Sequence, residues 1–171
     1  MSVSIASRHS LLDGLRREVA RLEGAAQARA GEPVPIAPGI DGVLPGGGLA
    51  RAAIHEILAS DPGTCAAFCG LVLGRAGGPA TWIEERPEPY PPGLAAFGLD
   101  PAGLIVVRAG RADLLWAAEE CLRCAALGAV VAVLPALDLA AGRRLQLAAE
   151  AGGALGLLVR PDRAPVPPSE I

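Results

Sequence analysis

The chain contains no lysine and no asparagine among its 171 residues, and all 15 of its basic side chains are arginine. The absence of lysine excludes the phosphate-binding lysine of a P-loop NTPase, a Schiff-base lysine and a lysine general base. The absence of asparagine removes an amide ligand and every acceptor for N-glycosylation. Abundant Ala, Gly, Pro and Arg are typical of a GC-biased genome, so composition alone accounts for the missing lysines, but the chemical exclusions hold either way.

The chain also has few aromatic residues and a small net charge. Aromatic side chains make up 3% of the chain, and the formal net charge is −3. This near-neutral balance argues against strong nonspecific binding to nucleic acid. No apolar run reaches the ~18 residues of a membrane span, and the N-terminus lacks the apolar core of a signal peptide. We therefore expect a cytoplasmic protein that does not bind membranes.

Four cysteines occur as two pairs, Cys65 with Cys69 and Cys121 with Cys124. Both pairs lie in helical patterns with apolar neighbours, and neither has a histidine close in sequence. Free cysteine is among the most buried residue types, so we expect small buried thiols and no bound metal. A four-cysteine zinc site is the alternative reading of the same spacing.

The first 48 residues differ from the rest of the chain. Ser10 is suited to cap a helix whose apolar positions, three or four residues apart, are Leu12, Leu15, Val19 and Leu22. Residues 31–48 are rich in proline and glycine. We expect a helical arm over residues 1–30 and a linker over 31–48. The stripe either packs on its own domain or binds a partner, and the sequence does not decide between the two.

From residue 49 onward, short apolar strands alternate with helices. The expected strands are 53–58, 81–85, 104–108, 129–134 and 155–160, and the expected helices are 65–75, 92–97, 111–127 and 139–151. Strands that are apolar on both faces and alternate with helices predict an α/β fold with a mostly parallel sheet flanked by helices. This core should span residues 49–160. A flexible proline-rich tail should follow over residues 161–171.

The loop between the first strand and its helix is where a phosphate would bind in a P-loop protein. It consists of Ala59, Ser60, Asp61, Pro62, Gly63, Thr64, Cys65 and Ala66. The loop lacks the G-x-x-x-x-G-K-[ST] pattern, and Asp61 places a negative charge where phosphates would sit. Gly46, Gly47 and Gly48 precede a strand, so they cannot aim a helix N-terminus at phosphate. The sequence therefore predicts no catalytic residues for ATP hydrolysis and no nucleotide cofactor.

The stretch IDGVLPGGGLARAAIHEI over residues 40–57, preceded by the helical segment LLDGLRREVARLEG, carries a family resemblance. It resembles the ImuA family of RecA-like accessory proteins from the bacterial damage-inducible mutagenesis cassette. The segment WIEE over residues 82–85 continues this likeness, which extends over residues 10–161. By the resemblance, Cys65 stands at the position that a RecA-type ATPase gives to lysine.

The resemblance implies a RecA-like fold and a protein without catalysis in SOS-induced mutagenic translesion synthesis, a branch of the response to DNA damage and of DNA repair. The implied partners are an ImuB-type inactive polymerase relative and a DnaE-type error-prone polymerase, with RecA as a further contact. DNA would be touched weakly or indirectly. Two alternatives are an ATP-binding RecA-family protein with a degenerate P-loop and a cell-division inhibitor of the SulA kind.

Carried onto this chain, the resemblance implies a residual acidic site at Glu84 or Glu85, after the second strand. The strand that would carry a magnesium-linked aspartate ends at Pro135, and Asp138 comes three residues too late. Because ligands gather at the carboxyl ends of parallel strands, the sequence predicts that one edge of the sheet holds Ser60, Asp61, Glu84, Glu85, Arg108, Arg111 and Asp138.

Four arginines are candidates for contact with an anion or DNA. Arg108 and Arg111 follow the third strand, where the alternative is pairing with nearby carboxylates. Arg143 and Arg144 lie on the last helix, where the alternative is a solvated helix face. Trp82 and Trp116 are expected in the core rather than as stacking platforms for bases.

Overall fold

The computed structural model describes residue 14, residues 31–87 and residues 89–161. The chain divides into two compact units, Met1–Glu32 and Pro33–Ile171, and the described fold belongs to the second unit. The predicted partner-binding stripe, Leu12, Leu15, Val19 and Leu22, lies outside the described residues. The same holds for residues 162–171 of the predicted tail.

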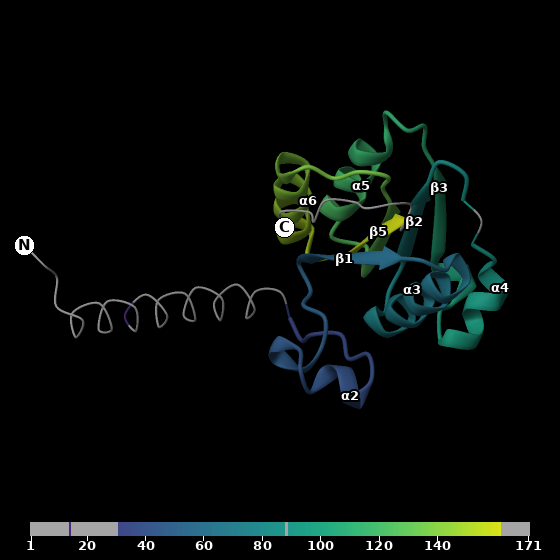
Figure 1. Ribbon diagram of the computed structural model, residues 1–171. Coiled ribbons are helices and arrows are strands. Elements are labelled where there is room, and N and C mark those ends of the chain that lie inside the picture. Colours follow the sequence, from purple (N-terminus) through teal and green to yellow (C-terminus); the bar gives the residue numbers. More distant parts are fainter. Residues whose placement is uncertain (1–13, 15–30, 88, 162–171) are drawn as a thin grey trace, which may run out of the picture. The chain divides into compact units, whose positions relative to one another are not determined.

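The second unit is built on a five-stranded parallel sheet (Figure 1). Its strands are β1 (Ala53–Ala59), β2 (Ala80–Glu84), β3 (Leu104–Arg108), β4 (Ala129–Val133) and β5 (Leu155–Pro161). Their order across the sheet is β1-β5-β4-β2-β3, so β1 and β3 form its two edges. The predicted α/β class, with a mostly parallel sheet flanked by helices, is confirmed, and the RecA likeness stays a prediction.

Helices cover both faces of this sheet, with α3 and α4 on one side and α5 and α6 on the other (Figure 1). The helical elements are α2 (Pro38–Asp41), η1 (Pro45–Gly47), α3 (Pro62–Ala76), α4 (Pro91–Leu94), η2 (Ala95–Phe97), η3 (Pro101–Gly103), α5 (Leu114–Arg123) and α6 (Leu139–Gly152). Among the described residues, none of these helices has the length and apolar character needed to cross a bilayer.

Side chains from alternate strand positions build two cores. Trp82 points toward α3, where it packs with buried residues such as Val72 and Leu157. Its neighbour Ile83 points toward α5 and α6 and is fully buried there with Leu122. Because both faces of the sheet are covered, the central strand β4 is apolar along its whole length.

The two tryptophans differ in their environment. Trp82 is 5% exposed and lies in the core, as predicted. Trp116 is 62% exposed, so the expectation that it belongs to the core is wrong. It follows Leu114 by two positions on α5, which turns it about 200° away from the buried side of the helix.

The glycine-rich segment ahead of β1 closes on itself. Val34 and Leu49 exchange backbone hydrogen bonds of 2.8 and 2.9 Å, and Val34 is buried. A Cβ atom on Gly48 would lie 2.5 Å from the Val34 carbonyl oxygen, so only glycine fits there. Residues 33–48, which the sequence predicts to be linker, therefore fold with the second unit. The remaining domain boundaries stay predictions.

Candidate functional site

The loops after β1, β2, β3 and β4 all leave the sheet at its carboxyl edge, because the strands are parallel. This edge collects the polar residues that sequence reasoning predicts there. Ser60 and Asp61 follow β1, Glu84 ends β2 and Glu85 follows it, and Arg108 ends β3. Arg111 and Asp138 lie in the loops that precede α5 and α6. Arg143 and Arg144 instead belong to α6.

The loop at the position of a P-loop is very short. Only Ser60 and Asp61 separate β1 from α3. The Asp61 carboxylate accepts a 2.6 Å hydrogen bond from the backbone N–H of Thr64. Hydrogen bonds from the side chain and from the backbone of Thr64 hold the pKa of Asp61 below its ordinary value. Asp61 is therefore the N-cap of α3, and Pro62 takes the first helical position.

Cys65 lies one turn into α3 and faces Cys69 on the next turn. A hydrogen bond from Cys69 lowers the pKa of the Cys65 thiol, against the opposing effects of burial and of the Glu84 and Asp61 carboxylates. The same hydrogen bond, together with burial, raises the pKa of Cys69 far above its ordinary value. Cys69 thus stays protonated and serves as the donor, and the pair sits beneath the β1–α3 loop.

The prediction that all four thiols are buried is fully confirmed only for the two cysteines of α3. Cys65 and Cys69 are buried, Cys121 is half-buried and Cys124 is exposed. The prediction is wrong for Cys124 because α5 ends at Arg123, one residue earlier. Over residues 31–87 and 89–161, no three His, Cys, Asp or Glu side chains are placed to hold a metal ion.

The two acidic residues after β2 have different surroundings. Glu84 is half-buried and accepts a 3.1 Å hydrogen bond from the indole N–H of Trp82, while Glu85 is exposed. Arg108 and Arg111 are both exposed, and neither forms an ion pair with any residue in the described part of the chain. Glu84 and Arg108 are register partners on β2 and β3.

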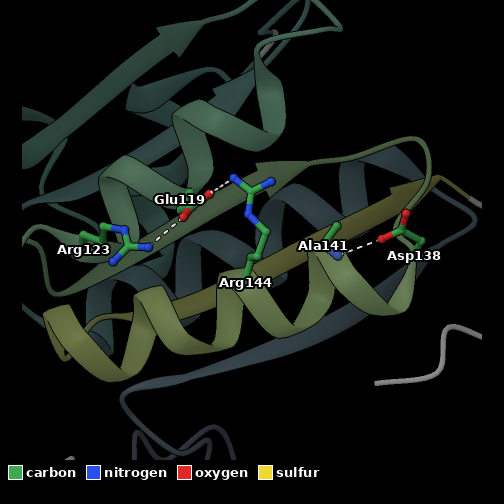
Figure 2. Close-up of polar contacts among 5 residues, drawn as sticks. All are labelled: Glu119, Arg123, Asp138, Ala141 and Arg144. Carbon is green, nitrogen blue, oxygen red and sulfur yellow. Dashed lines mark hydrogen bonds and ion pairs between the residues drawn. The ribbon is translucent and has the colours of Figure 1, made fainter.

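Asp138, the acidic residue in the loop after β4, caps a helix through a hydrogen bond to the backbone. Asp138 accepts a 2.7 Å hydrogen bond from the Ala141 N–H and caps α6 (Figure 2). Leu134 and Pro135 follow β4 directly. Asp61 and Asp138 therefore perform the same task at the start of two helices, and each carboxylate fills the position at which a helix N-terminus would bind an anion.

Arg144 is bound within the protein. Its guanidinium reaches from α6 to Glu119 on α5, and Arg123 binds the other carboxylate oxygen at 2.7 Å (Figure 2). Glu119 is 8% exposed, and the Arg123 hydrogen bond, followed by that from Arg144, holds its pKa below the ordinary value. This arrangement ties α5 to α6. Arg143 is also exposed, and it forms no ion pair with the described residues.

The sequence analysis does not predict two polar contacts that the structure contains. Glu56 on β1 forms a largely buried ion pair with Arg160 on β5. Gln146 on α6 accepts a 3.1 Å hydrogen bond from the Ile54 N–H and donates one of 3.3 Å to the Ala52 carbonyl. Charged residues inside otherwise apolar strands were a signal for the first contact, whereas the second has no local signal.

Comparisons with known proteins place this arrangement in context. No protein-family model matches the chain. Two curated proteins named Protein ImuA, from Caulobacter vibrioides strains NA1000 and ATCC 19089, are each 41% identical to it over 132 residues. The match covers 71% of this chain and 54% of each ImuA protein.

The fold also matches a solved structure of SulA from Pseudomonas aeruginosa, with a TM-score of 0.54 and 28% sequence identity. That match covers 64% of this chain and 98% of the SulA chain. The chain spans about half the length of the curated relatives it matches. Over that span it is a homologue of Protein ImuA and belongs to the ImuA family, as its sequence predicts.

Proposed function

We propose that the chain is a non-catalytic, RecA-like accessory protein that acts in SOS-induced mutagenic translesion synthesis by binding other proteins. Homology to Protein ImuA supports a role in this mutagenesis pathway. The observation that carries the non-catalytic part is the capped N-terminus of α3, where the Asp61 carboxylate bonds to the Thr64 N–H at 2.6 Å.

The geometry of this loop opposes nucleotide binding in three ways. P-loops bind phosphate with successive backbone N–H groups of a glycine-rich loop and the following helix. Here the loop has only Ser60 and Asp61, which is too short to surround a phosphate. The N–H of Thr64 is already bound by a carboxylate, whose charge repels phosphate. The lysine that would neutralise the β- and γ-phosphates is missing from the whole chain.

A titration with a fluorescent ATP analogue and Mg²⁺ tests this part of the proposal. We expect no saturable binding and no hydrolysis. An Asp61→Gly variant, which lacks the capping carboxylate, should also fail to bind, because the lysine remains absent. Micromolar binding with turnover by the unmodified chain would overturn the proposal and favour an ATP-binding RecA-family protein with a degenerate P-loop. A RecA-type ATPase serves as the positive control.

For partners, we propose an ImuB-type inactive polymerase relative and, through it, a DnaE-type error-prone polymerase. RecA is a further proposed contact, and DNA is reached weakly or through these proteins. The proposed contact is the apolar stripe of the first unit, which contains Leu15 and Val19. The exposed Arg108, Arg111 and Arg143 are proposed as secondary contacts with anions or DNA.

Co-purification with an ImuB-type protein tests the partner and the contact together. A Leu15→Asp/Val19→Asp variant should lose the complex, whereas an Arg16→Gln/Arg17→Gln control on the same segment should keep it. If the doubly substituted protein folds and still binds, the stripe is not the contact. If the unmodified chain recovers no ImuB-type protein, the proposed partner is wrong.

A second candidate, a SulA-like inhibitor of cell division, is favoured by one observation. The described fold matches 98% of the SulA chain from Pseudomonas aeruginosa. Sequence identity is lower with SulA, at 28%, than with ImuA, at 41%, so we place this function second. Recovery of FtsZ rather than a polymerase from a pulldown would reverse that order.

A further inference from the structure

The outer edge of β3 is apolar and open on both faces. Ile105 is 52% exposed and Val106 is 44% exposed, although they point to opposite sides of the sheet. The Ala109 N–H bonds to the Glu84 carbonyl at 3.2 Å, so the odd-numbered residues of this segment turn their backbone groups toward β2. The backbone groups of Val106 consequently point away from the sheet. Within the described residues, no backbone hydrogen bond from another segment reaches them.

The opposite edge of the sheet is protected. The side-chain amide of Gln146 bonds to the Ile54 N–H and the Ala52 carbonyl, which are groups that a neighbouring strand would use. A charged residue, Glu56, stands in the middle of β1. Blocking groups and charged residues are the usual means by which proteins prevent strand addition at an edge. β3 has neither until Arg108, its last residue.

The sequence of β3 is complementary to itself in the antiparallel direction. A two-fold axis through Val106 sets this residue opposite its counterpart, and Val106 is the central outward-facing residue of the strand. Ile105 then lies opposite Val107 of the second copy, and Arg108 lies opposite Leu104. Aliphatic side chains therefore meet across the axis, and no like charges are paired. The same operation on β1 would be centred on Glu56 and would set two carboxylates against each other.

We propose that two copies of this chain associate through β3, antiparallel and centred on Val106, so that one sheet continues across both molecules. The N–H and C=O of each Val106 bond to those of the other copy, and the Arg108 N–H bonds to the Leu104 carbonyl of the second copy. This is an isologous interface, closed by its two-fold symmetry.

Sedimentation velocity over a wide concentration series tests the proposal. The unmodified chain should pass from monomer to dimer as its concentration rises. Val106→Arg and Val106→Glu should each raise the dimer dissociation constant by about tenfold or more, because like charges then face each other at the axis. An equimolar mixture of these two variants should dimerise again. Leu58→Arg, which adds the same charge at an exposed position of β1, should leave the dimer unchanged.

Several results would overturn the proposal. One is an unmodified chain that stays monomeric throughout the series, and this measurement stands even if a variant fails to fold. Another is a Val106→Arg protein that dimerises as tightly as the unmodified chain. A mixture of the two charge variants that remains monomeric would also overturn it, as would loss of the dimer in Leu58→Arg alone, which would assign the interface to β1. Circular dichroism confirms that each variant is folded.

Discussion

Removing both arginines that bind Glu119 should destabilise the protein by more than the sum of the two single changes. Glu119 is the shared partner, with its side chain 10% exposed, whereas those of Arg123 and Arg144 are 49% and 56% exposed. Either arginine alone still supplies a positive charge next to the carboxylate. Only the double variant leaves a largely buried carboxylate with neither of these two charges beside it.

The expected sizes follow from these exposures. Arg123→Ala and Arg144→Ala should each lower the free energy of unfolding by about 0.5–1 kcal/mol, the range for pairs with a solvated partner. The double variant should lose about 3 kcal/mol, because breaking a buried pair leaves an uncompensated charge. The coupling free energy is therefore about 1–2 kcal/mol. Adding Glu119→Leu to the double variant should recover most of the loss, since the buried charge is then gone.

Urea unfolding followed by the fluorescence of the buried Trp82 measures the unmodified chain and its four variants. A double variant that loses no more than the sum of the single variants would refute this account of Glu119. The pH dependence supplies a further check. Because the pKa of Glu119 is lowered on folding, its stabilisation is complete above its unfolded pKa and is lost as the pH falls through its folded pKa. The difference between the unmodified chain and the double arginine variant should shrink over that acid range.

Three other predictions concern backbone packing, the α3 cap and the thiols. Gly128→Ala should lower the free energy of unfolding in urea by about 3 kcal/mol, because the new Cβ atom would lie 1.8 Å from the Gly77 carbonyl oxygen. Gly103→Ala is the control, since the nearest atom to its new Cβ would be 3.9 Å away. Asp61→Ala should lower the melting temperature at neutral pH by removing the cap, and since the pKa of Asp61 is lowered on folding, this difference should vanish as the pH falls through that pKa. In the native protein, a thiol reagent should modify Cys124 first, and Cys124→Ser should remove that fast phase while the α3 thiols react only on unfolding.

The regular elements could be predicted because their periodicity is local. The strand expected at residues 104–108 coincides with β3, and the helix expected at 139–151 ends one residue short of α6. The helix expected to begin at Cys65 begins three residues earlier, at Pro62. Asp61 followed by Pro62 is itself a helix-start signal, but a phosphate-binding pattern at this position implies a longer connection and therefore a later helix start.

The long helix expected at 111–127 is shorter than predicted for a tertiary reason. α5 ends at Arg123, where the chain passes very close to α6. A Cβ atom on Gly152 would lie 2.1 Å from the Leu122 carbonyl oxygen. Helical periodicity continues past this point in the sequence, so no local pattern reveals that the backbone of another helix occupies the space.

The location of the candidate site was predictable, but the use of its side chains was not. Parallel strands place Asp61, Glu84, Arg108 and Asp138 at one edge whatever their individual roles. Whether a carboxylate is free or caps a helix depends on one or two backbone dihedral angles. Arg144 forms an ion pair with Glu119, which lies 25 residues away in sequence. Such pairings depend on how two helices pack against each other.

The pairing of β1 with β5 has a consequence for how the protein folds during synthesis. Ala53 pairs with Leu155, about 100 residues later in the chain, whereas β2 finds both of its partner strands much sooner. A nascent chain therefore holds β1 unpaired until nearly the whole second unit has left the ribosome. Contacts between such distant residues form late and slow the overall rate. The strand that leads into the α3 cap should thus be the last to dock, which exposes its apolar side chains to chaperones for longest.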